Sequence, residues 1–108
     1  MPTVLLLALA IVTEVGATIA LRSSDGFTRL WPSVAVVAGY GLSFVLLSLV
    51  LRQLSVGYVY AVWSAAGTAL IAVIGILAFG EGASALKLAS LGLIMAGVVG
   101  LDLAGGAQ

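Results

Sequence analysis

Long apolar runs, separated by short polar breaks, dominate the chain. Four runs stand out, at about 3–21, 32–51, 56–79 and 84–103, and none alternates between apolar and polar positions. Each approaches the length of about 20 apolar residues with which a helix crosses the hydrocarbon core of a bilayer. Continuous runs favour helices over the alternating strands of a membrane barrel. The pattern therefore predicts an all-α membrane protein with four transmembrane helices in a single domain, residues 1–108.

The polar breaks predict how neighbouring helices run. They are short, so successive helices are expected to be antiparallel. The first and third breaks carry Arg22, Arg29 and Lys87, whereas the second carries Arg52. The positive-inside rule then predicts that the first and third loops face the cytoplasm, with insertion in both orientations left open.

Composition supports a membrane protein and narrows its chemistry. Hydrophobic residues make up 63% of the chain and charged residues 7%, and the mean hydropathy is +1.32. The net charge of zero argues against nucleic acid as a partner. The chain has neither cysteine nor histidine, so a metal site would lack its commonest ligand. No phosphate-binding loop or nucleophile motif occurs, and we expect neither an enzyme nor a cofactor or metal.

Glu14 lies near the middle of the first run. An ionised carboxylate at that depth costs at least about 2.5 kcal/mol, and such groups normally face a protein interior or a watery cavity. Helical spacing places Ala10, Ile11 and Thr18 on the same face, and Thr18 can donate a hydrogen bond to the carboxylate. No basic residue lies at comparable depth in the other runs. We predict a protonatable cation-binding site at Glu14, the alternative being a protonated, packed side chain without function.

Aromatic residues supply a second part of the predicted site. Tyr60, Trp63 and Gly67 share one helical face, by spacings of three, four and seven residues. An aromatic face near a carboxylate suits a lipophilic cation, because the ring quadrupole attracts positive charge, most strongly for Trp. An interfacial aromatic belt is the alternative, and it fits Tyr60 better than Trp63. In the second run, Tyr40 and Ser43 either line the same cavity or pack in the core.

Small residues mark the fourth run. Gly92, Ala96 and Gly100 recur every four residues, and Ser90 and Gly97 lie seven apart on another face. Small residues let helices approach closely in lipid. The spacing fits packing within one subunit or a seam between two subunits. Four helices cannot easily both pack together and enclose a cavity for an organic molecule, whereas eight can, so we expect a dimer.

Three segments together resemble one known family. They are Glu14-Val15 in the first run, Gly26-Phe27-Thr28-Arg29-Leu30-Trp31-Pro32-Ser33 after it, and Tyr60-Ala61-Val62-Trp63-Ser64 in the third run. These segments resemble the small multidrug resistance transporters, and the similarity extends over nearly the whole chain, including its length.

The resemblance implies a function and an assembly. It implies an antiparallel, dual-topology homodimer of eight helices in the bacterial cytoplasmic membrane. This dimer would export polyaromatic and quaternary ammonium cations in exchange for protons, with the proton gradient as its energy source. Glu14 of both subunits would bind proton and drug by turns. The positions that match family residues facing the drug site are Ala10, Ile11, Thr18, Tyr40, Ser43, Tyr60 and Trp63. Ser90 and Gly97 match the dimer contact, and Gly67 matches a hinge.

Some positions depart from the family pattern or separate its branches. Gly16 stands where a guanidinium-exporting branch has Trp, which favours the drug-exporting branch. Ala65 replaces a hinge glycine and leaves Gly67 alone there, and Ser90 replaces a glycine at the dimer contact. Val4 replaces an aromatic residue, so the substrate range is expected to differ. The alternatives are a guanidinium or polyamine exporter of the same family and one subunit of an obligate heterodimer with a paralogue.

Overall fold

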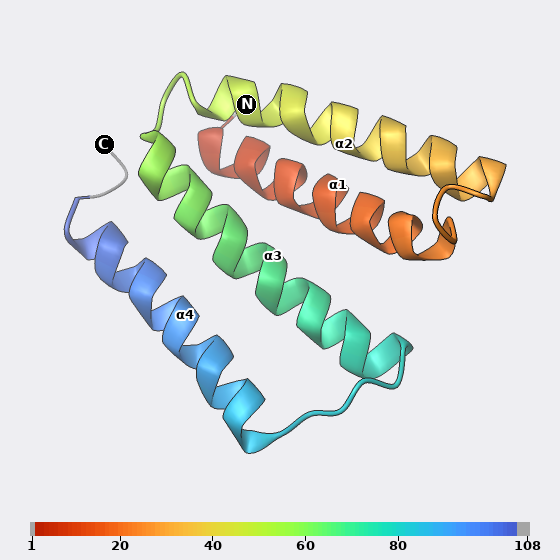
Figure 1. Ribbon diagram of the computed structural model, residues 1–108. Helices are drawn as coiled ribbons and strands as arrows, with labels where there is room; N and C mark the ends of the chain where they lie inside the picture. The colour runs from red at the N-terminus through yellow and green to blue at the C-terminus, as the bar shows by residue number, and fades with distance from the viewer. Residues whose placement is uncertain (1, 106–108) are drawn as a thin grey trace. The chain divides into compact units, whose positions relative to one another are not determined.

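The computed structural model describes residues 2–105 as four α-helices joined by short loops (Figure 1). The helices are α1 (Thr3–Ser23), α2 (Leu30–Val50), α3 (Val56–Ala78) and α4 (Ala85–Leu103). All four are long and apolar enough to cross a membrane, and no strand occurs among the described residues. The prediction of an all-α membrane protein with four spanning helices is confirmed, whereas the antiparallel dimer stays a prediction.

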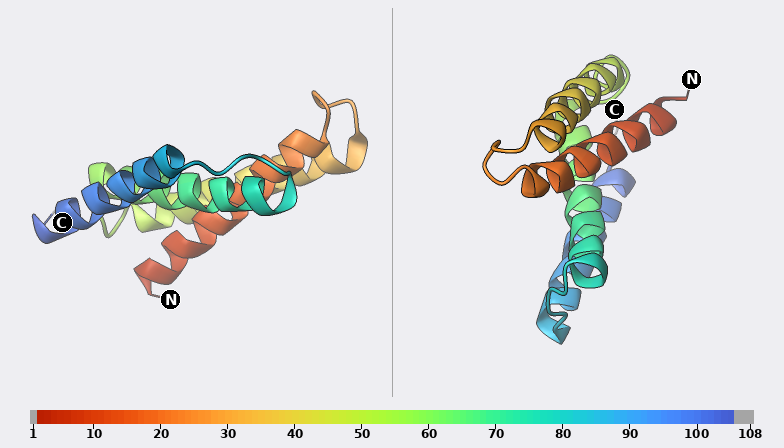
Figure 2. Two further views of the ribbon diagram at one scale, coloured as in Figure 1. Left: turned by 90° about the horizontal axis from the view of Figure 1, so that it is seen from below. Right: turned by 90° about the vertical axis from the view of Figure 1, so that its right-hand side faces the viewer.

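The chain divides after Gln53 into two compact units, each built from one pair of helices. Within the first unit α1 and α2 lie side by side and run in opposite directions, and within the second unit α3 and α4 do the same (Figures 1 and 2). The short loops impose this arrangement. The union of the two units in a single domain stays a prediction.

The helix ends follow local capping and differ by up to two residues from the predicted bounds. α1 continues to Ser23, and α2 begins at Leu30 rather than at Pro32. Proline is tolerated in a first turn because its missing N–H is one of those without an intrahelical partner. Ser55 and Ser84 precede α3 and α4, and each hydroxyl accepts a hydrogen bond from the backbone N–H three residues later. Serine is among the preferred residues for this capping position.

The backbones of α1 and α2 approach closely at Gly39. A Cβ atom at that position would lie 2.8 Å from the Ala17 Cβ and 3.3 Å from the Thr13 carbonyl oxygen. Ala17 itself is buried. Small residues at such a crossing allow van der Waals contact between helices that have no hydrophobic drive to associate in lipid. The first unit is therefore held together by close backbone packing as well as by buried side chains. The buried residues of the two helices are Leu7, Ala10, Ile11, Val15, Ala17, Val36, Ser43 and Val50.

Ser24 organises the loop between α1 and α2. Its side chain is fully buried, and its hydroxyl donates to the Leu21 carbonyl oxygen at 2.7 Å. The same hydroxyl accepts a hydrogen bond from the Phe27 N–H at 3.1 Å. The Ser24 carbonyl oxygen accepts from the N–H groups of Thr28 and Arg29, at 2.9 and 3.1 Å. Ser24 thus provides partners for one carbonyl oxygen at the end of α1 and for three backbone N–H groups of the loop.

Three successive residues of this loop have left-handed backbone conformations. Asp25, Gly26 and Phe27 have φ angles of 50°, 69° and 66°. Glycine adopts such angles freely, and Asp does so more readily than most residues, but a bulky side chain at positive φ is an outlier. The hydrogen bonds of Ser24 therefore hold a strained turn at Phe27.

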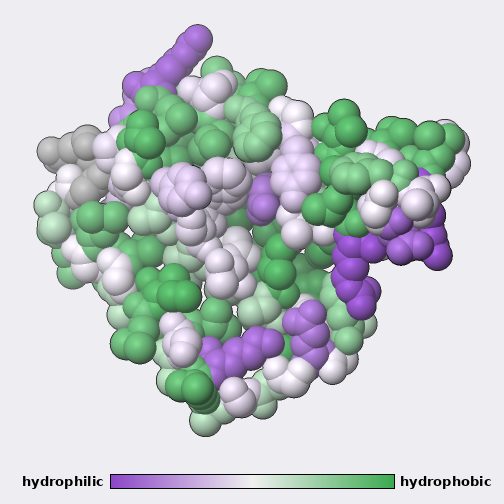
Figure 3. All heavy atoms as spheres, in the orientation of Figure 1, coloured by the Kyte–Doolittle hydropathy of each residue, from purple (hydrophilic) through white to green (hydrophobic). Residues whose placement is uncertain are grey.

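In the second unit, α4 is the more open helix. α3 buries Val59, Ala65, Gly67 and Gly75, whereas no residue between Ala85 and Leu103 is buried. In Figure 3 hydrophobic residues cover most of the visible surface along the helices, and hydrophilic residues gather mainly towards their ends. This distribution suits helices that face lipid.

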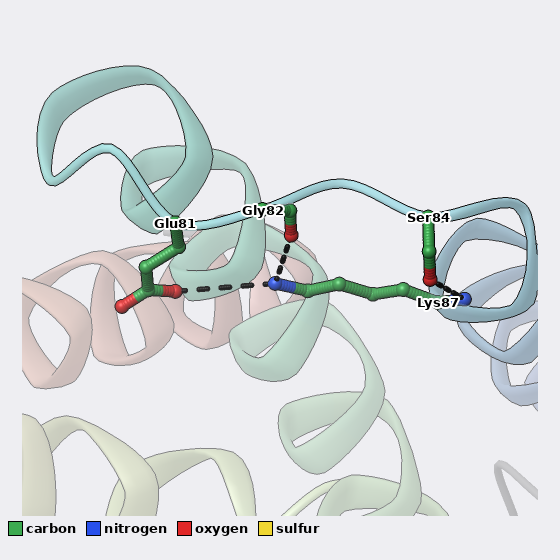
Figure 4. A network of polar contacts seen from close by, with 4 residues as sticks. All are labelled: Glu81, Gly82, Ser84 and Lys87. Atoms are coloured by element: carbon green, nitrogen blue, oxygen red, sulfur yellow. Dashed lines mark hydrogen bonds and ion pairs between the residues drawn. The ribbon is translucent and has the colours of Figure 1, made fainter.

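A small network of polar contacts joins the loop between α3 and α4 to the first turn of α4 (Figure 4). The Glu81 carboxylate folds back over Gly75, where a Cβ atom would collide with it, and the Glu81 N–H donates to the Gly75 carbonyl oxygen at 3.0 Å. The Lys87 Nζ lies 4.0 Å from Glu81 Oε1 and donates to the Gly82 carbonyl oxygen at 3.1 Å. The charges of this loop thus neutralise each other in part.

Candidate functional site

Glu14 occupies the middle of α1, about three turns from either end of the helix. Its side chain is half-buried, and its Oε1 atom accepts a hydrogen bond from the Thr18 hydroxyl at 3.0 Å. This is the hydrogen bond expected from the helical spacing of the two residues. No ion pair joins Glu14 to a basic side chain in the part of the chain that is described. Among the described residues, its carboxylate is therefore left with a neutral hydroxyl partner and without a counter-ion.

Tyr40 extends this arrangement from α2. Its hydroxyl oxygen lies 2.6 Å from the Thr18 Oγ1, so the hydroxyls of the two residues share a hydrogen bond across the helix pair. The Tyr40 ring stacks on that of Phe44, with ring centroids 6.3 Å apart. Tyr40, Thr18 and Glu14 thus form one hydrogen-bonded chain, which we name the hydroxyl relay. The structure brings these three of the predicted site residues together.

Ala10, Ile11 and Ser43 lie in the buried part of the first unit. Ala10 is 2% exposed and Ser43 is 1% exposed. The Ser43 hydroxyl donates to the Ala10 carbonyl oxygen at 2.8 Å, so it joins α2 to α1 one turn before Glu14. Bonds between polar side chains and neighbouring backbone are a common means of joining helices in lipid. In this unit the Ser43 side chain hydrogen-bonds α2 to α1. Its contact with a substrate stays a prediction.

The aromatic residues of the second unit form a pair of their own. The Tyr60 and Trp63 rings meet edge to face, with centroids 5.9 Å apart. Tyr60 is 64% exposed and Trp63 is half-buried, so this pair presents ring surface on one side of α3. Such a surface can attract a cation through the ring quadrupole. Gly67, one turn further along α3, is buried, and its role as a hinge stays a prediction.

Ser90 and Gly97 lie on the exposed surface of α4. A Cβ atom at Gly92, Gly97 or Gly100 would meet nothing within 4 Å, so these three glycines make no close contact with α3 in the second unit. Packing against α3 therefore does not explain their spacing. The dimer contact that the spacing suggests stays a prediction.

Two features of the helix pairs have no signal in the sequence pattern. Gly39 sets the distance between α1 and α2, yet a single glycine in an apolar run carries no pattern. The Tyr58 hydroxyl on α3 hydrogen-bonds the Asp102 carboxylate on α4. That contact joins the first turn of α3 to the last turn of α4. Only the antiparallel course of the two helices would have suggested it.

No group of three or more acidic residues that could hold a metal ion occurs between residues 2 and 105. The helices of the described chain carry the Glu14 carboxylate, the hydroxyls bonded to it and to each other, and two pairs of aromatic rings. These groups can hold a proton or an organic cation.

Comparison with known proteins agrees with a site for organic cations. Residues 3–94 match the model of the family described as Small Multidrug Resistance protein. The quaternary ammonium compound-resistance protein QacE of Escherichia coli is 50% identical over 99 residues, which cover 92% of this chain and 90% of the relative. The multidrug resistance protein mmr of Mycolicibacterium paratuberculosis is 49% identical over 104 residues, covering 95% of this chain and 97% of the relative. QacF of Klebsiella aerogenes, also a quaternary ammonium compound-resistance protein, is 50% identical over 97 residues, covering 90% and 88%.

The family model spans α1, α2, α3 and the first half of α4, a range that includes Glu14, Tyr40 and Trp63, and these relatives cover at least 90% of the chain. On this evidence the chain belongs to the small multidrug resistance family of membrane transporters.

Proposed function

We propose that this protein exports lipophilic and quaternary ammonium cations in exchange for protons, and that Glu14 binds the two by turns. The exporter works in the bacterial cytoplasmic membrane as an antiparallel homodimer, or as a heterodimer with a paralogue. Its energy source is the proton gradient, without a cofactor.

One observation carries the proposal. Glu14 is a carboxylate in the middle of a membrane-spanning helix, and its side-chain partner among the described residues is the neutral hydroxyl of Thr18. Since an unpaired ionised carboxylate is costly in the membrane, it must gain a proton or a cation. A single carboxylate that binds a proton and a cation alternately is the simplest site that can exchange one for the other.

Mutual exclusion at this carboxylate supplies the coupling. A protonated carboxyl group carries no charge to attract a cation, and a carboxylate paired with a cation has a lower affinity for a proton. If access to Glu14 alternates between the two sides of the membrane, each outward passage of a cation requires inward passage of protons. The aromatic pair Tyr60 and Trp63 favours flat or quaternary cations through its ring surfaces.

The available energy suffices for export. If two protons enter for each monovalent cation that leaves, one net charge crosses the membrane, which contributes about 2.3 kcal/mol per 100 mV. A pH gradient adds about 1.4 kcal/mol per unit for each proton. Since about 1.4 kcal/mol corresponds to a factor of ten in concentration, the two terms support more than tenfold accumulation outside.

Binding of tetraphenylphosphonium to the purified protein across a range of pH tests the proposal. We expect wild-type protein to bind it at high pH and to release it as the pH falls, because protons then occupy Glu14. Glu14→Gln is expected to fold but to lose both the binding and the proton-coupled export, since the amide cannot ionise. Unaltered binding by Glu14→Gln would overturn the proposal.

Glu81→Gln is a matched control for this experiment. It makes the same chemical change at a side chain that is 53% exposed in the loop between α3 and α4. We expect its binding curve to match that of the wild-type protein. A loss as large as that of Glu14→Gln would mean that total charge, and not the intramembrane carboxylate, governs binding.

A further inference from the structure

The hydroxyl relay joins the intramembrane carboxylate of α1 to a phenol on α2. Thr18 Oγ1 lies 3.0 Å from Glu14 Oε1 and 2.6 Å from the Tyr40 hydroxyl oxygen. It also lies 3.0 Å from the Glu14 carbonyl oxygen, one turn back along the helix. The Thr18 hydroxyl therefore faces three oxygens and has a single proton to donate.

The protonation state of Glu14 fixes the direction of this relay. An ionised carboxylate only accepts hydrogen bonds, so Thr18 must donate to Oε1, and Tyr40 must in turn donate to Thr18. A protonated carboxyl group has a proton of its own to donate. It can donate to the Thr18 oxygen, and Thr18 then donates to Tyr40 or to the Glu14 carbonyl oxygen. When Thr18 donates to Tyr40, the phenol changes from a donor within the relay to an acceptor, and its own hydroxyl hydrogen becomes available to another acceptor.

We propose that Thr18 and Tyr40 are positioning residues that stabilise the ionised form of Glu14 and transmit its protonation to α2 by reversing the direction of the relay. This inference rests on the proposed function, because it assigns the hydroxyls a part in the competition between proton and cation. It differs from a direct contact between Tyr40 and the cation, since Tyr40 acts here through Thr18.

Few other charges bear on the relay. Tyr40 is the only titratable side chain of α2, the helix that packs against α1, and α2 carries no charged residue between Leu30 and Val50. On α1 the other charged side chain is Arg22, two turns beyond Glu14 and in the last turn of the helix. In the described part of the first unit, the Thr18 hydroxyl of the relay is therefore the side chain that hydrogen-bonds the Glu14 carboxylate.

The test measures tetraphenylphosphonium binding by the full-length protein as a function of pH, in Thr18→Val, Tyr40→Phe and the double variant. Thr18→Val keeps the branched shape but removes the donor to the ionised carboxylate. We expect the pH of half-maximal binding to rise by about one unit, because a hydrogen bond to the charged form favours that form. Tyr40→Phe is expected to shift the midpoint less, in the same direction, since it only weakens the polarisation of Thr18.

The double variant separates a relay from two independent effects. If Tyr40 acts through Thr18, the Tyr40→Phe change adds no further shift once Thr18 is Val, whereas independent contributions would add. A Tyr40→Phe shift that persists in the Thr18→Val background would overturn the proposal in favour of a direct contact with the cation. The proposal would also be overturned, in favour of a direct contact between Thr18 and the cation, if Thr18→Val lost binding at every pH while Thr18→Ser bound normally.

Thr13→Val is the matched control. Thr13 lies on α1 next to Glu14, and among the described residues its hydroxyl bonds the backbone carbonyl oxygens of Leu9 and Ala10 and no side chain. We expect no shift of the midpoint in this variant and restoration of the wild-type midpoint in Thr18→Ser. If Thr18→Val and Tyr40→Phe leave the midpoint unchanged while Glu14→Gln abolishes binding, the relay fails and the proposed function stands. If Glu14→Gln binds normally, the proposed function itself fails.

Discussion

Gly39→Ala tests whether the distance between α1 and α2 sets the geometry of the site. The added Cβ atom would lie 2.8 Å from the Ala17 Cβ and 3.4 Å from its Cα. Carbon atoms pack best at about 3.5–4.0 Å, so the helices must separate locally by about 0.7 Å or more. Ala17 cannot relieve the contact by changing its rotamer, because its Cβ is fixed to the helix backbone.

This separation is large enough to break the hydroxyl relay. The oxygens of Tyr40 and Thr18 are 2.6 Å apart, and a displacement of about 0.7 Å takes them past the range of about 2.5–3.0 Å for such bonds. Overpacking costs about 1–3 kcal/mol, whereas replacement of glycine by alanine in a helix gains about 1 kcal/mol. We therefore expect a net destabilisation on the order of 1 kcal/mol and a higher pH of half-maximal tetraphenylphosphonium binding.

The assay is thermal unfolding in detergent together with the pH profile of binding, and Gly41→Ala is the control. Gly41 lies on the same helix two residues away, and a Cβ atom there would meet nothing within 4 Å. Gly41→Ala is expected to bind like the wild-type protein. The reasoning is refuted if Gly39→Ala and Gly41→Ala are indistinguishable in stability and in the midpoint of binding.

Three further predictions concern the loops and the aromatic pair. Phe27→Gly relieves a positive φ of 66° and should raise the melting temperature of the protein in detergent, and a lower melting temperature contradicts the strain at this position. Gly75→Ala places a Cβ atom where the Glu81 carboxylate lies, so that exposed side chain must move away, and the melting temperature should rise less than in Gly57→Ala, which has open space; equal rises in the two variants contradict the seating of Glu81. Trp63→Ala should weaken tetraphenylphosphonium binding about 3- to 30-fold at high pH through loss of a cation–π contact, with Trp63→Phe intermediate, and an unchanged dissociation constant places the cation elsewhere.

The sequence predicted the helices well because each is a continuous apolar run, and lipid leaves few other solutions for such runs. Its errors lie at the ends. The second helix was expected to begin at Pro32, but it begins at Leu30, because a proline is accepted anywhere in the first turn and does not mark its first residue. Ser84 was included in the fourth helix, but it caps the helix from outside.

The site was predictable only where one helix contains both partners. The bond from Thr18 to Glu14 follows from their spacing of four residues and is present. The bonds from Tyr40 to Thr18 and from Ser43 to Ala10 cross between helices, and they depend on the rotation of α2 about its axis. Apolar runs without a polar face do not specify that rotation, because lipid accepts every face of such a helix.

The turn at Ser24 has a consequence for membrane insertion. A backbone group that enters a membrane needs a hydrogen-bond partner inside the protein. Ser24 supplies such partners within the turn itself. The tip of the first hairpin can therefore approach the lipid headgroups without leaving these backbone groups unpaired. The two N-terminal helices can therefore enter the bilayer together as a preformed hairpin, with Arg22 and Arg29 at its tip to hold the turn on one side.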